Sequence, residues 1–260
     1  MTGAVQSRRK EMTVGLRTSA SIVALCLAAG AGLAQYPFSE RYDLAELELT
    51  IVPEYVFARV RFQTSRGRRR PGWAHDYPRA EQNLLRILSE VTAVHTEPAA
   101  HTVVSLESPE IMKYPVLYFS EPGTWAISPE EAANLRDYLS RGGFAIFDDF
   151  DGAWDWQVFE AAMARVLPGR HFEVLEVEDS VYQSFFAIED LDVITHPMGH
   201  GGPPIFLGIR DDSGRLQVVA NFNNDIGDYW EWSDQGWYPI DLSNEGYKLG
   251  VNYVIYAMTH

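Results

Sequence analysis

Two acidic segments of this 260-residue chain carry side chains that could hold a cation. The first is Asp148-Asp149-Phe150-Asp151, and the second runs from Asn223-Asn224-Asp225 to Trp230-Glu231. Carboxylate oxygens are the ligands that Ca²⁺ and Mg²⁺ accept, so a divalent cation is one interpretation, with three candidate ligands in the first segment: Asp148, Asp149 and Asp151. Asp225, Asp228 and Glu231 can add ligands if the two segments adjoin. The same acids also suit helix caps and turns, and calcium-loop spacing is absent, so the sequence favours structural roles over a metal and indicates no definite cofactor.

The same segments allow acid–base chemistry. Asp149 and Glu231 could act as the acid and base of a glycan hydrolase, with neighbouring tryptophans and tyrosines stacking on sugar rings. His196 is a third catalytic candidate, as a general base, and lies near His200 in a glycine-rich stretch. The simpler interpretation is that the aromatic residues pack loops onto a sheet and the histidines lie in a surface loop.

Missing motifs narrow the activities further. The chain has no Gly-x-Ser-x-Gly elbow, no phosphate-binding Gly-x-x-x-x-Gly-Lys loop and no dinucleotide fingerprint. A single cysteine excludes a disulfide framework and a cysteine-rich metal site. The net charge of −15 counts against nucleic acid as a partner.

Alternating strand-like and helix-like segments must position these residues. Strands are predicted at 55–62, 116–119, 144–147, 172–177 and 216–222, and helices behind Pro78, after the Ser128 cap, over 156–167 and over 249–258. This order predicts an α/β three-layer sandwich with a largely parallel sheet and helices on both faces. Ligands of such sheets bind beyond the carboxyl ends of the strands. The predicted crevice is lined by Asp148, Asp149, Asn223, Asp225, Trp230 and Glu231.

The N-terminus is typical of a secretory signal. Basic residues precede an apolar run that begins at Ile22, and small residues precede a cut after Ala34. We expect a signal peptide over 1–34, with Met1 or Met12 as the start, a lead-in over 35–54 and one domain over 55–260. The mature chain would then hold no cysteine and no transmembrane anchor, and would be periplasmic or secreted.

An ordered set of short motifs resembles one bacterial family, the domain of unknown function 4159. The motifs span residues 55–260 and are Arg59-Val60-Arg61-Phe62, Trp73…Asp76-Tyr77-Pro78, Tyr114-Pro115…Tyr118, Leu135-Arg136…Tyr138-Leu139…Gly142-Gly143-Phe144…Asp148-Asp149, Asn223-Asn224-Asp225…Trp230-Glu231 and Gly250-Val251-Asn252…Tyr256-Ala257. That family is similar to the class I glutamine amidotransferase-like fold, near the ThuA-like proteins. The resemblance implies a flavodoxin-like sandwich but no activity, and adds Arg59, Asp76 and Tyr77 to the ligand-binding candidates.

Two departures, one from the amidotransferase pattern and one from the pattern of the family itself, shape the functional hypotheses. The candidate elbow Phe147-Asp148-Asp149-Phe150 has no nucleophilic cysteine, which excludes thiol-based amidotransfer, and Asp179-Ser180-Val181-Tyr182-Gln183 stands where relatives carry histidines before Ser184-Phe185.

The first hypothesis is an exported binding module for a small molecule, a glycan or an envelope protein. The second is a secreted hydrolase that cleaves a sugar or cell-wall polymer with paired carboxylates, with or without a metal. A purely structural domain is the third, so enzymatic activity stays open.

Overall fold

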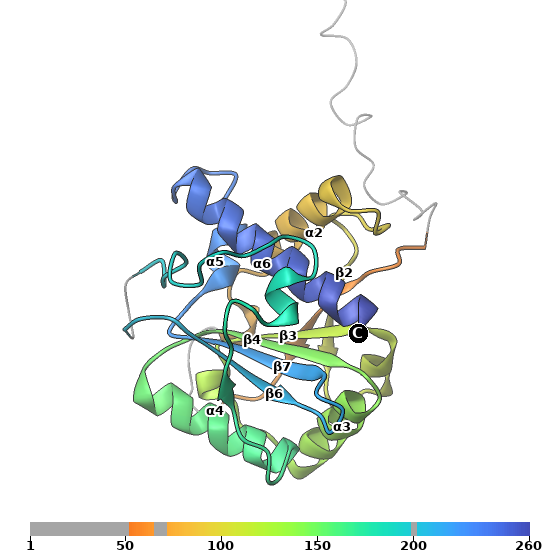
Figure 1. Ribbon diagram of the computed structural model, residues 1–260. Helices are drawn as coiled ribbons and strands as arrows, with labels where there is room; N and C mark the ends of the chain where they lie inside the picture. Colours follow the sequence, from red (N-terminus) through yellow and green to blue (C-terminus); the bar gives the residue numbers. More distant parts are fainter. Residues whose placement is uncertain (1–51, 65–71, 199–201) are drawn as a thin grey trace, which may run out of the picture. The chain divides into compact units, whose positions relative to one another are not determined.

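The fold is organised around one seven-stranded sheet within the compact unit that spans residues 53–260 (Figure 1). The computed structural model describes residues 52–64, 72–198 and 202–260. The strands are β1 (Phe57–Arg61), β2 (His101–Ser105), β3 (Val116–Ser120), β4 (Phe144–Phe150), β5 (Glu173–Val174), β6 (Ile205–Arg210) and β7 (Leu216–Phe222). Their spatial order is β2-β1-β3-β4-β7-β6-β5.

The five strands β2, β1, β3, β4 and β7 are parallel, and β6 and β5 extend the sheet in antiparallel pairing. The prediction of a largely parallel sheet is therefore confirmed. In register, Ser120 at the end of β3 lies beside Asp148 in β4, and Phe150 lies beside Phe222 in β7. The carboxyl ends of β3, β4 and β7 thus form one continuous edge, as the two acidic segments require.

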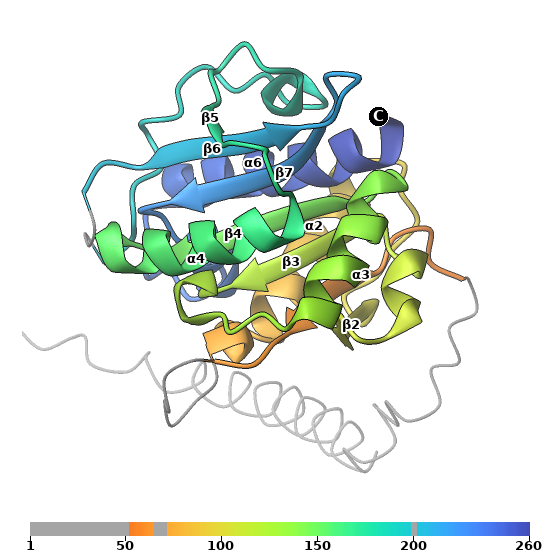
Figure 2. The same cartoon turned by 90° about the horizontal axis from the view of Figure 1, so that it is seen from below.

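Helices cover both faces of the sheet, which gives three layers (Figure 2). On one face lie α2 (Arg79–Val91), α5 (Ile226–Glu231) and α6 (Ile240–Thr259), which contact one another, and on the other lie α3 (Pro129–Ser140) and α4 (Gly152–Val166). Short 3₁₀ helices fill the connections: η2 (Gly72–Ala74), η3 (Pro109–Lys113), η4 (Pro122–Thr124) and η5 (Ser180–Gln183).

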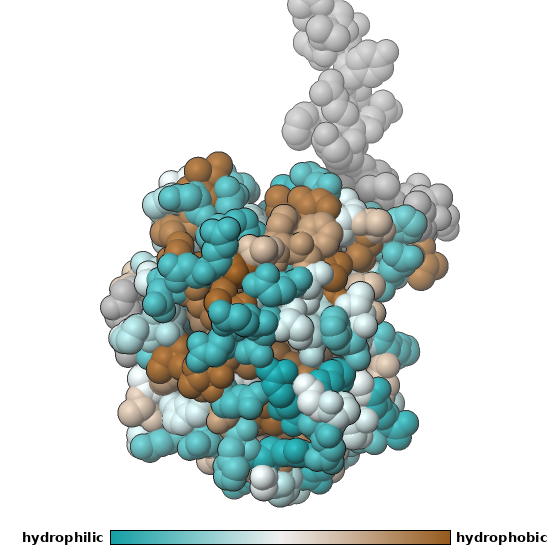
Figure 3. Space-filling view, viewed as in Figure 1, coloured by the Kyte–Doolittle hydropathy of each residue, from teal (hydrophilic) through white to brown (hydrophobic). Residues whose placement is uncertain are grey.

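Strand alternation divides the core into two apolar clusters, one on each face. Tyr118 of β3 packs with the cluster under α2 and α6, whereas its neighbours Leu117 and Phe119 pack with the cluster under α3 and α4. Successive side chains of a strand point to opposite faces of the sheet. A strand that is buried on both faces therefore has a continuous apolar sequence, and such a sequence predicted β3. The surface over α6 and its neighbours mixes hydrophilic residues with smaller hydrophobic areas (Figure 3).

Local signals account for the helix ends. The Ser128 hydroxyl accepts the amide of Glu131, and the Glu131 carboxylate accepts the amide of Ser128, so the predicted capping box starts α3. Gly142, with φ of 99°, follows the end of this helix in the left-handed conformation that glycine favours.

Several predicted boundaries were wrong. The helix predicted over 156–167 begins at Gly152, and the helix predicted from Leu249 begins at Ile240, because the first half of that helix buries Ser243, Gly246 and Tyr247 and shows no apolar stripe. The strand predicted over 172–177 is reduced to the two residues of β5, which pair with the outer side of β6. The strands β2 and β6 were not predicted.

Three sequence predictions lie outside the described residues: the signal peptide over 1–34, nearly all of the lead-in over 35–54, and His200. Among the described residues, no helix combines the length and the apolar character needed to cross a membrane.

Candidate functional site

The candidate site lies where the segments that follow β1, β3, β4 and β7 meet at the carboxyl edge of the sheet. The turn η2 comes after β1 and contacts β3 and η4, and α5 comes after β7 and contacts β4. Segments separated by up to about three-quarters of the domain therefore place their side chains together, at the edge where parallel α/β sheets bind ligands.

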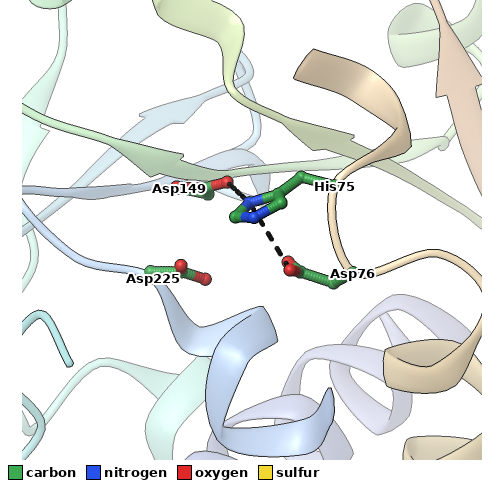
Figure 4. A group of neighbouring side chains, drawn as sticks. All are labelled: His75, Asp76, Asp149 and Asp225. Carbon is green, nitrogen blue, oxygen red and sulfur yellow. Dashed lines mark hydrogen bonds and ion pairs between the residues drawn. The ribbon is translucent and has the colours of Figure 1, made fainter. Parts of the chain in front are cut away.

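Four side chains form the first acidic group: His75, Asp76, Asp149 and Asp225 (Figure 4). One ligand atom from each lies within 4.8 Å of the others. The Nδ1 atom of His75 is 2.8 Å from Oδ2 of Asp149 and 3.4 Å from Oδ1 of Asp76. The His75 side chain is 49% exposed, so the group is buried on the protein side and reaches solvent through the imidazole.

Asp76 is the most unusual member of this group. Its side chain is fully buried, and neither carboxylate oxygen has a hydrogen-bond partner among the described residues. Buried polar groups are almost always paired, and an unpaired buried carboxylate is costly. Burial raises the pKa of Asp76 well above its usual range, and the Asp149 carboxylate raises it further. A proton on Asp76, or positive charge close to it, is therefore needed to compensate this carboxyl group.

A second acidic group adjoins the first and shares Asp76 with it. It contains Asp76, Asp228 and Glu231, whose ligand atoms again lie within 4.8 Å of one another. Asp228 and Glu231 are three residues apart on α5, so both project from one side of the helix. Burial also raises the pKa of Glu231.

In the first group, burial and then repulsion between the carboxylates are the main causes that raise the pKa values of the acids. Burial raises the pKa of Asp225 well above its usual range, with neighbouring carboxylates adding to the effect. Burial raises the pKa of Asp149 to about 7, against the opposing hydrogen bond from His75. That same hydrogen bond is the main cause that raises the pKa of His75 to about 10. Strongly perturbed groups gathered at one strand edge are typical of functional sites.

Backbone strain concentrates at the same place. In the described part of the chain, the non-glycine residues with positive φ are Asp76 (63°), Glu121 (50°), Asp149 (60°) and Asn223 (57°), and each lies at or beyond the end of a strand of this edge. Glu121 belongs to the site as well, since its Oε1 atom is 3.9 Å from Nδ1 of His75. Left-handed backbone costs energy for residues other than glycine and persists where the surroundings enforce it, often at functional sites.

Asp148 forms the floor beneath this group rather than part of its surface. Its two oxygens accept hydrogen bonds from the Tyr118 hydroxyl (2.7 Å), the Asn221 side-chain amide (3.0 Å) and the Gly227 backbone amide (2.9 Å). The Tyr253 hydroxyl in turn donates to Asn221 at 2.8 Å. Asp148 therefore ties β3, β7 and α5 together, and its lone pairs are used within the protein.

Arg59 supports the loop that carries His75 and Asp76. Its side chain is fully buried, its Nε donates to Glu81, and its Nη1 donates to the backbone carbonyls of Trp73 (3.1 Å) and His75 (2.5 Å). The guanidinium also lies over the Tyr118 ring, 4.9 Å from its centroid. This arrangement fixes the η2 turn above the end of β1.

The structure gathers four of the predicted site residues in the two acidic groups: Asp76, Asp149, Asp225 and Glu231. Asp228, which the sequence offered as a further ligand if the strand ends adjoin, joins them because β4 and β7 are neighbours.

Other predicted residues lie around the groups. Asn223 accepts the Gly152 amide and donates to the Pro203 carbonyl, and so joins two loops. Trp230 is 1% exposed and donates to the Gly246 carbonyl from the core. The Tyr77 hydroxyl is 3.1 Å from Nδ1 of His101. Asp151 is the N-cap residue of α4, and His196 accepts the amide of Met198 within its loop; neither belongs to the two groups.

Sequence reasoning missed His75 and Glu121. His75 stands in the stretch Trp73-Ala74-His75-Asp76, where its position beside an acid was the only available signal. Glu121 directly follows the buried strand β3, so the rule that sites lie at carboxyl ends of parallel strands could have identified it.

Comparison with known proteins places the whole domain in one family. No curated protein matches the chain. The sequence profile described as Domain of unknown function (DUF4159) matches residues 56–258, which include every residue of the two acidic groups. The chain therefore belongs to the DUF4159 family.

Proposed function

We propose that this protein binds a divalent cation in the first acidic group, through His75, Asp76, Asp149 and Asp225, and uses the cation to bind an oxygen-bearing ligand. The observation that carries the proposal is the fully buried Asp76 carboxylate, which has no hydrogen-bond partner among the described residues and lies beside three other potential ligands. A divalent cation supplies two positive charges to the three carboxylates of this group, Asp76, Asp149 and Asp225.

The donor set supports a particular kind of cation. One imidazole nitrogen with carboxylate oxygens suits Mn²⁺ or Zn²⁺ better than Ca²⁺, which takes oxygen ligands only. Since His75 is half exposed, a cation held beside it would retain a solvent-facing side for the ligand. The other three ligands come from the end of β4, the η2 turn and the cap of α5, which are held by the sheet and by Arg59.

Thermal melting of the purified full chain tests the cation. After removal of metals with EDTA, Mn²⁺, Zn²⁺, Mg²⁺ and Ca²⁺ are added separately to the wild type, Asp76→Asn and the surface control Asp137→Asn. A cation at 100 times its Kd stabilises the folded state by about 2.7 kcal/mol, which is a rise of several degrees in Tm. The rise is expected in the wild type and in Asp137→Asn but not in Asp76→Asn. No rise with any cation, or an equal rise in Asp76→Asn, would overturn the proposal.

A second candidate function is cation-assisted hydrolysis of a sugar or cell-wall polymer. The observation that favours it is the contact between His75 and Asp149: if His75 stays on Asp149 and the three carboxylates alone hold the cation, this half-exposed imidazole can exchange protons with a ligand on the cation. The test is release of soluble sugars from cell-wall polymers in the presence of Mn²⁺. His75→Asn should abolish release while Asp137→Asn keeps it; equal release by His75→Asn would exclude this mechanism.

We further infer export and a distant relation to amidotransferase-like proteins. The expected signal peptide over 1–34 supports a periplasmic or secreted location. The order β2-β1-β3-β4-β7 agrees with the flavodoxin-like order and supports that finer assignment. Mass spectrometry of the N-terminus of the exported protein tests the cut after Ala34, and an intact N-terminus would contradict it.

A further inference from the structure

Asp76 belongs to both acidic groups, and we propose that its carboxylate bridges two divalent cations, one in each group. This inference rests on the proposed function and deepens it by adding a second cation beside Asp228 and Glu231. The two groups share one residue and together hold five carboxyl groups and one imidazole: His75, Asp76, Asp149, Asp225, Asp228 and Glu231.

The two oxygens of Asp76 face different neighbours. Oδ1 lies 3.4 Å from Nδ1 of His75, on the side of the first group. Oδ2 lies against α5, since a methyl group at Gly227 would approach it to 2.8 Å. Both oxygens are buried and have no hydrogen-bond partner among the described residues. The carboxylate is therefore oriented to offer one oxygen to the first group and one toward the helix that carries the second.

In the second group, hydrogen bonds hold Asp228 in place, whereas Glu231 is open to solvent. The Asp228 carboxylate accepts hydrogen bonds from the Tyr238 hydroxyl at 3.0 Å and from the Trp232 indole at 3.2 Å, which fix its orientation. Each carboxylate oxygen keeps a further lone pair for a cation. Glu231 is only partly buried, so this side of the group reaches solvent.

Charge balance also favours two cations over one. One divalent cation leaves three of the five carboxylates of the two groups without a compensating charge, because His75 is neutral when it binds the cation. Two divalent cations bring four positive charges and leave the charge of only one carboxylate without compensation. Bound cations are the largest local charges in such sites and decide how many carboxylates can ionise together.

A bridged pair defines the class of ligand more narrowly than a single cation. Two cations that share a carboxylate lie about 3.5–4 Å apart and can hold two oxygens of one group at once. The ligand that this geometry fits is an oxyanion such as a phosphate ester or a carboxylate. Inorganic phosphate is the simplest probe of this chemistry.

The test counts cations and asks whether they are neighbours. The purified full chain is dialysed against Mn²⁺, and bound manganese is measured per folded chain for the wild type, Glu231→Gln and the exposed control Glu130→Gln. We expect two ions in the wild type and the control, and one in Glu231→Gln. Electron paramagnetic resonance of the two-ion form should show magnetic coupling, which inorganic phosphate perturbs and Glu231→Gln removes.

The outcomes separate the two proposals. No bound manganese in the wild type overturns the proposed function itself. One ion in the wild type, unchanged in Glu231→Gln, overturns only the second cation. Two ions without magnetic coupling, or coupling that survives in Glu231→Gln, overturns the bridging role of Asp76. Circular dichroism of Glu231→Gln before dialysis confirms that the variant is folded, so a lower count reports on binding.

Discussion

The Nδ1 atom of His75 lies 2.8 Å from Oδ2 of Asp149, although the two residues are 74 positions apart in the chain. This contact joins the turn that follows η2 to the end of β4 and closes the first acidic group on its exposed side (Figure 4). Each residue shifts the proton affinity of the other, so the pair should control how the stability of the metal-free protein depends on pH.

The free energy of unfolding of the metal-free protein should fall as the pH rises from about 4 to about 7. The pKa of Asp149 is raised from 3.8 to about 7 in the folded state, so in this window the folded chain keeps a proton that the unfolded chain has lost. One such proton changes stability by at most about 1.4 kcal/mol per pH unit. Denaturant unfolding in EDTA at pH 5, 6 and 7 measures the slope.

Asp149→Asn should reduce this slope by the contribution of one proton, whereas Asp137→Asn should keep it; Asp76, Asp225 and Glu231, whose pKa values are also raised, keep their own contributions. The loss of stability should continue above pH 7 in the wild type, because the raised pKa of His75, about 10, keeps the folded imidazole protonated after the unfolded one has lost its proton. Asparagine suits the left-handed backbone of position 149, so the variant isolates the charge. Identical slopes in the wild type and Asp149→Asn would show that this carboxyl group does not titrate as proposed.

Asp225→Asn should stabilise the metal-free protein and at the same time remove its response to Mn²⁺. Burial and neighbouring carboxylates raise the pKa of Asp225, so the neutral amide avoids a cost that the acid bears. The amide oxygen can still accept the Asp228 amide, which the carboxylate accepts at 3.0 Å. Melting with and without Mn²⁺ measures both effects; a variant less stable than wild type in EDTA would contradict the account.

Removal of Arg59 should destabilise the protein strongly. Arg59→Met leaves Glu81 as an unpaired buried carboxylate and the carbonyls of Trp73 and His75 without their donor. Breaking a buried ion pair costs about 3–5 kcal/mol. The double variant Arg59→Met, Glu81→Met should lose less than the sum of the single losses, as a double-mutant cycle in denaturant will show. Additive losses would mean that the pair is not coupled.

Gly250→Ala should destabilise the domain despite the better helix propensity of alanine. A methyl group at this position of α6 would approach Leu84 Cδ1 and Trp230 Cζ2 to 2.8 Å. Overpacking of this kind costs about 1–3 kcal/mol, more than the roughly 1 kcal/mol that alanine gains over glycine in a helix. Asn244→Ala, on the exposed side of α6, is the control and should be neutral or slightly stabilising. A Gly250→Ala variant as stable as wild type would mean that α6 can shift away from α2.

Much of the fold could be predicted from the sequence because its strongest signals are local. The strand predicted at 216–222 matches β7, and the capping box at Ser128 starts α3. The short strand β2 was missed because it pairs only with β1 at the edge of the sheet and is only partly buried. The helix α6 was recognised only in its second half because its first half buries Ser243 and Gly246, the latter against Tyr229, in place of an apolar stripe.

The sequence predicted only those parts of the site that directly follow parallel strands, because the ends of such strands lie close together. Asp149 and Asp225 could be paired because both follow parallel strands, and β4 and β7 are neighbours. The role of Asp148 could not be predicted, since its carboxylate accepts hydrogen bonds from Tyr118, Asn221 and Gly227, which belong to three separate elements. His75 was missed because it reaches the edge from a turn beyond β1, and that position follows from tertiary packing around Arg59.

The most direct test of the cation site is a crystal structure of the full chain grown with Mn²⁺, with diffraction measured at the manganese absorption edge. We expect an anomalous peak within about 2.0–2.4 Å of carboxylate oxygens from Asp76, Asp149 and Asp225. We also expect that the Nδ1 atom of His75 turns from Asp149 to the ion. An anomalous map without a peak among these four side chains, at a manganese concentration that saturates binding in solution, would contradict the account.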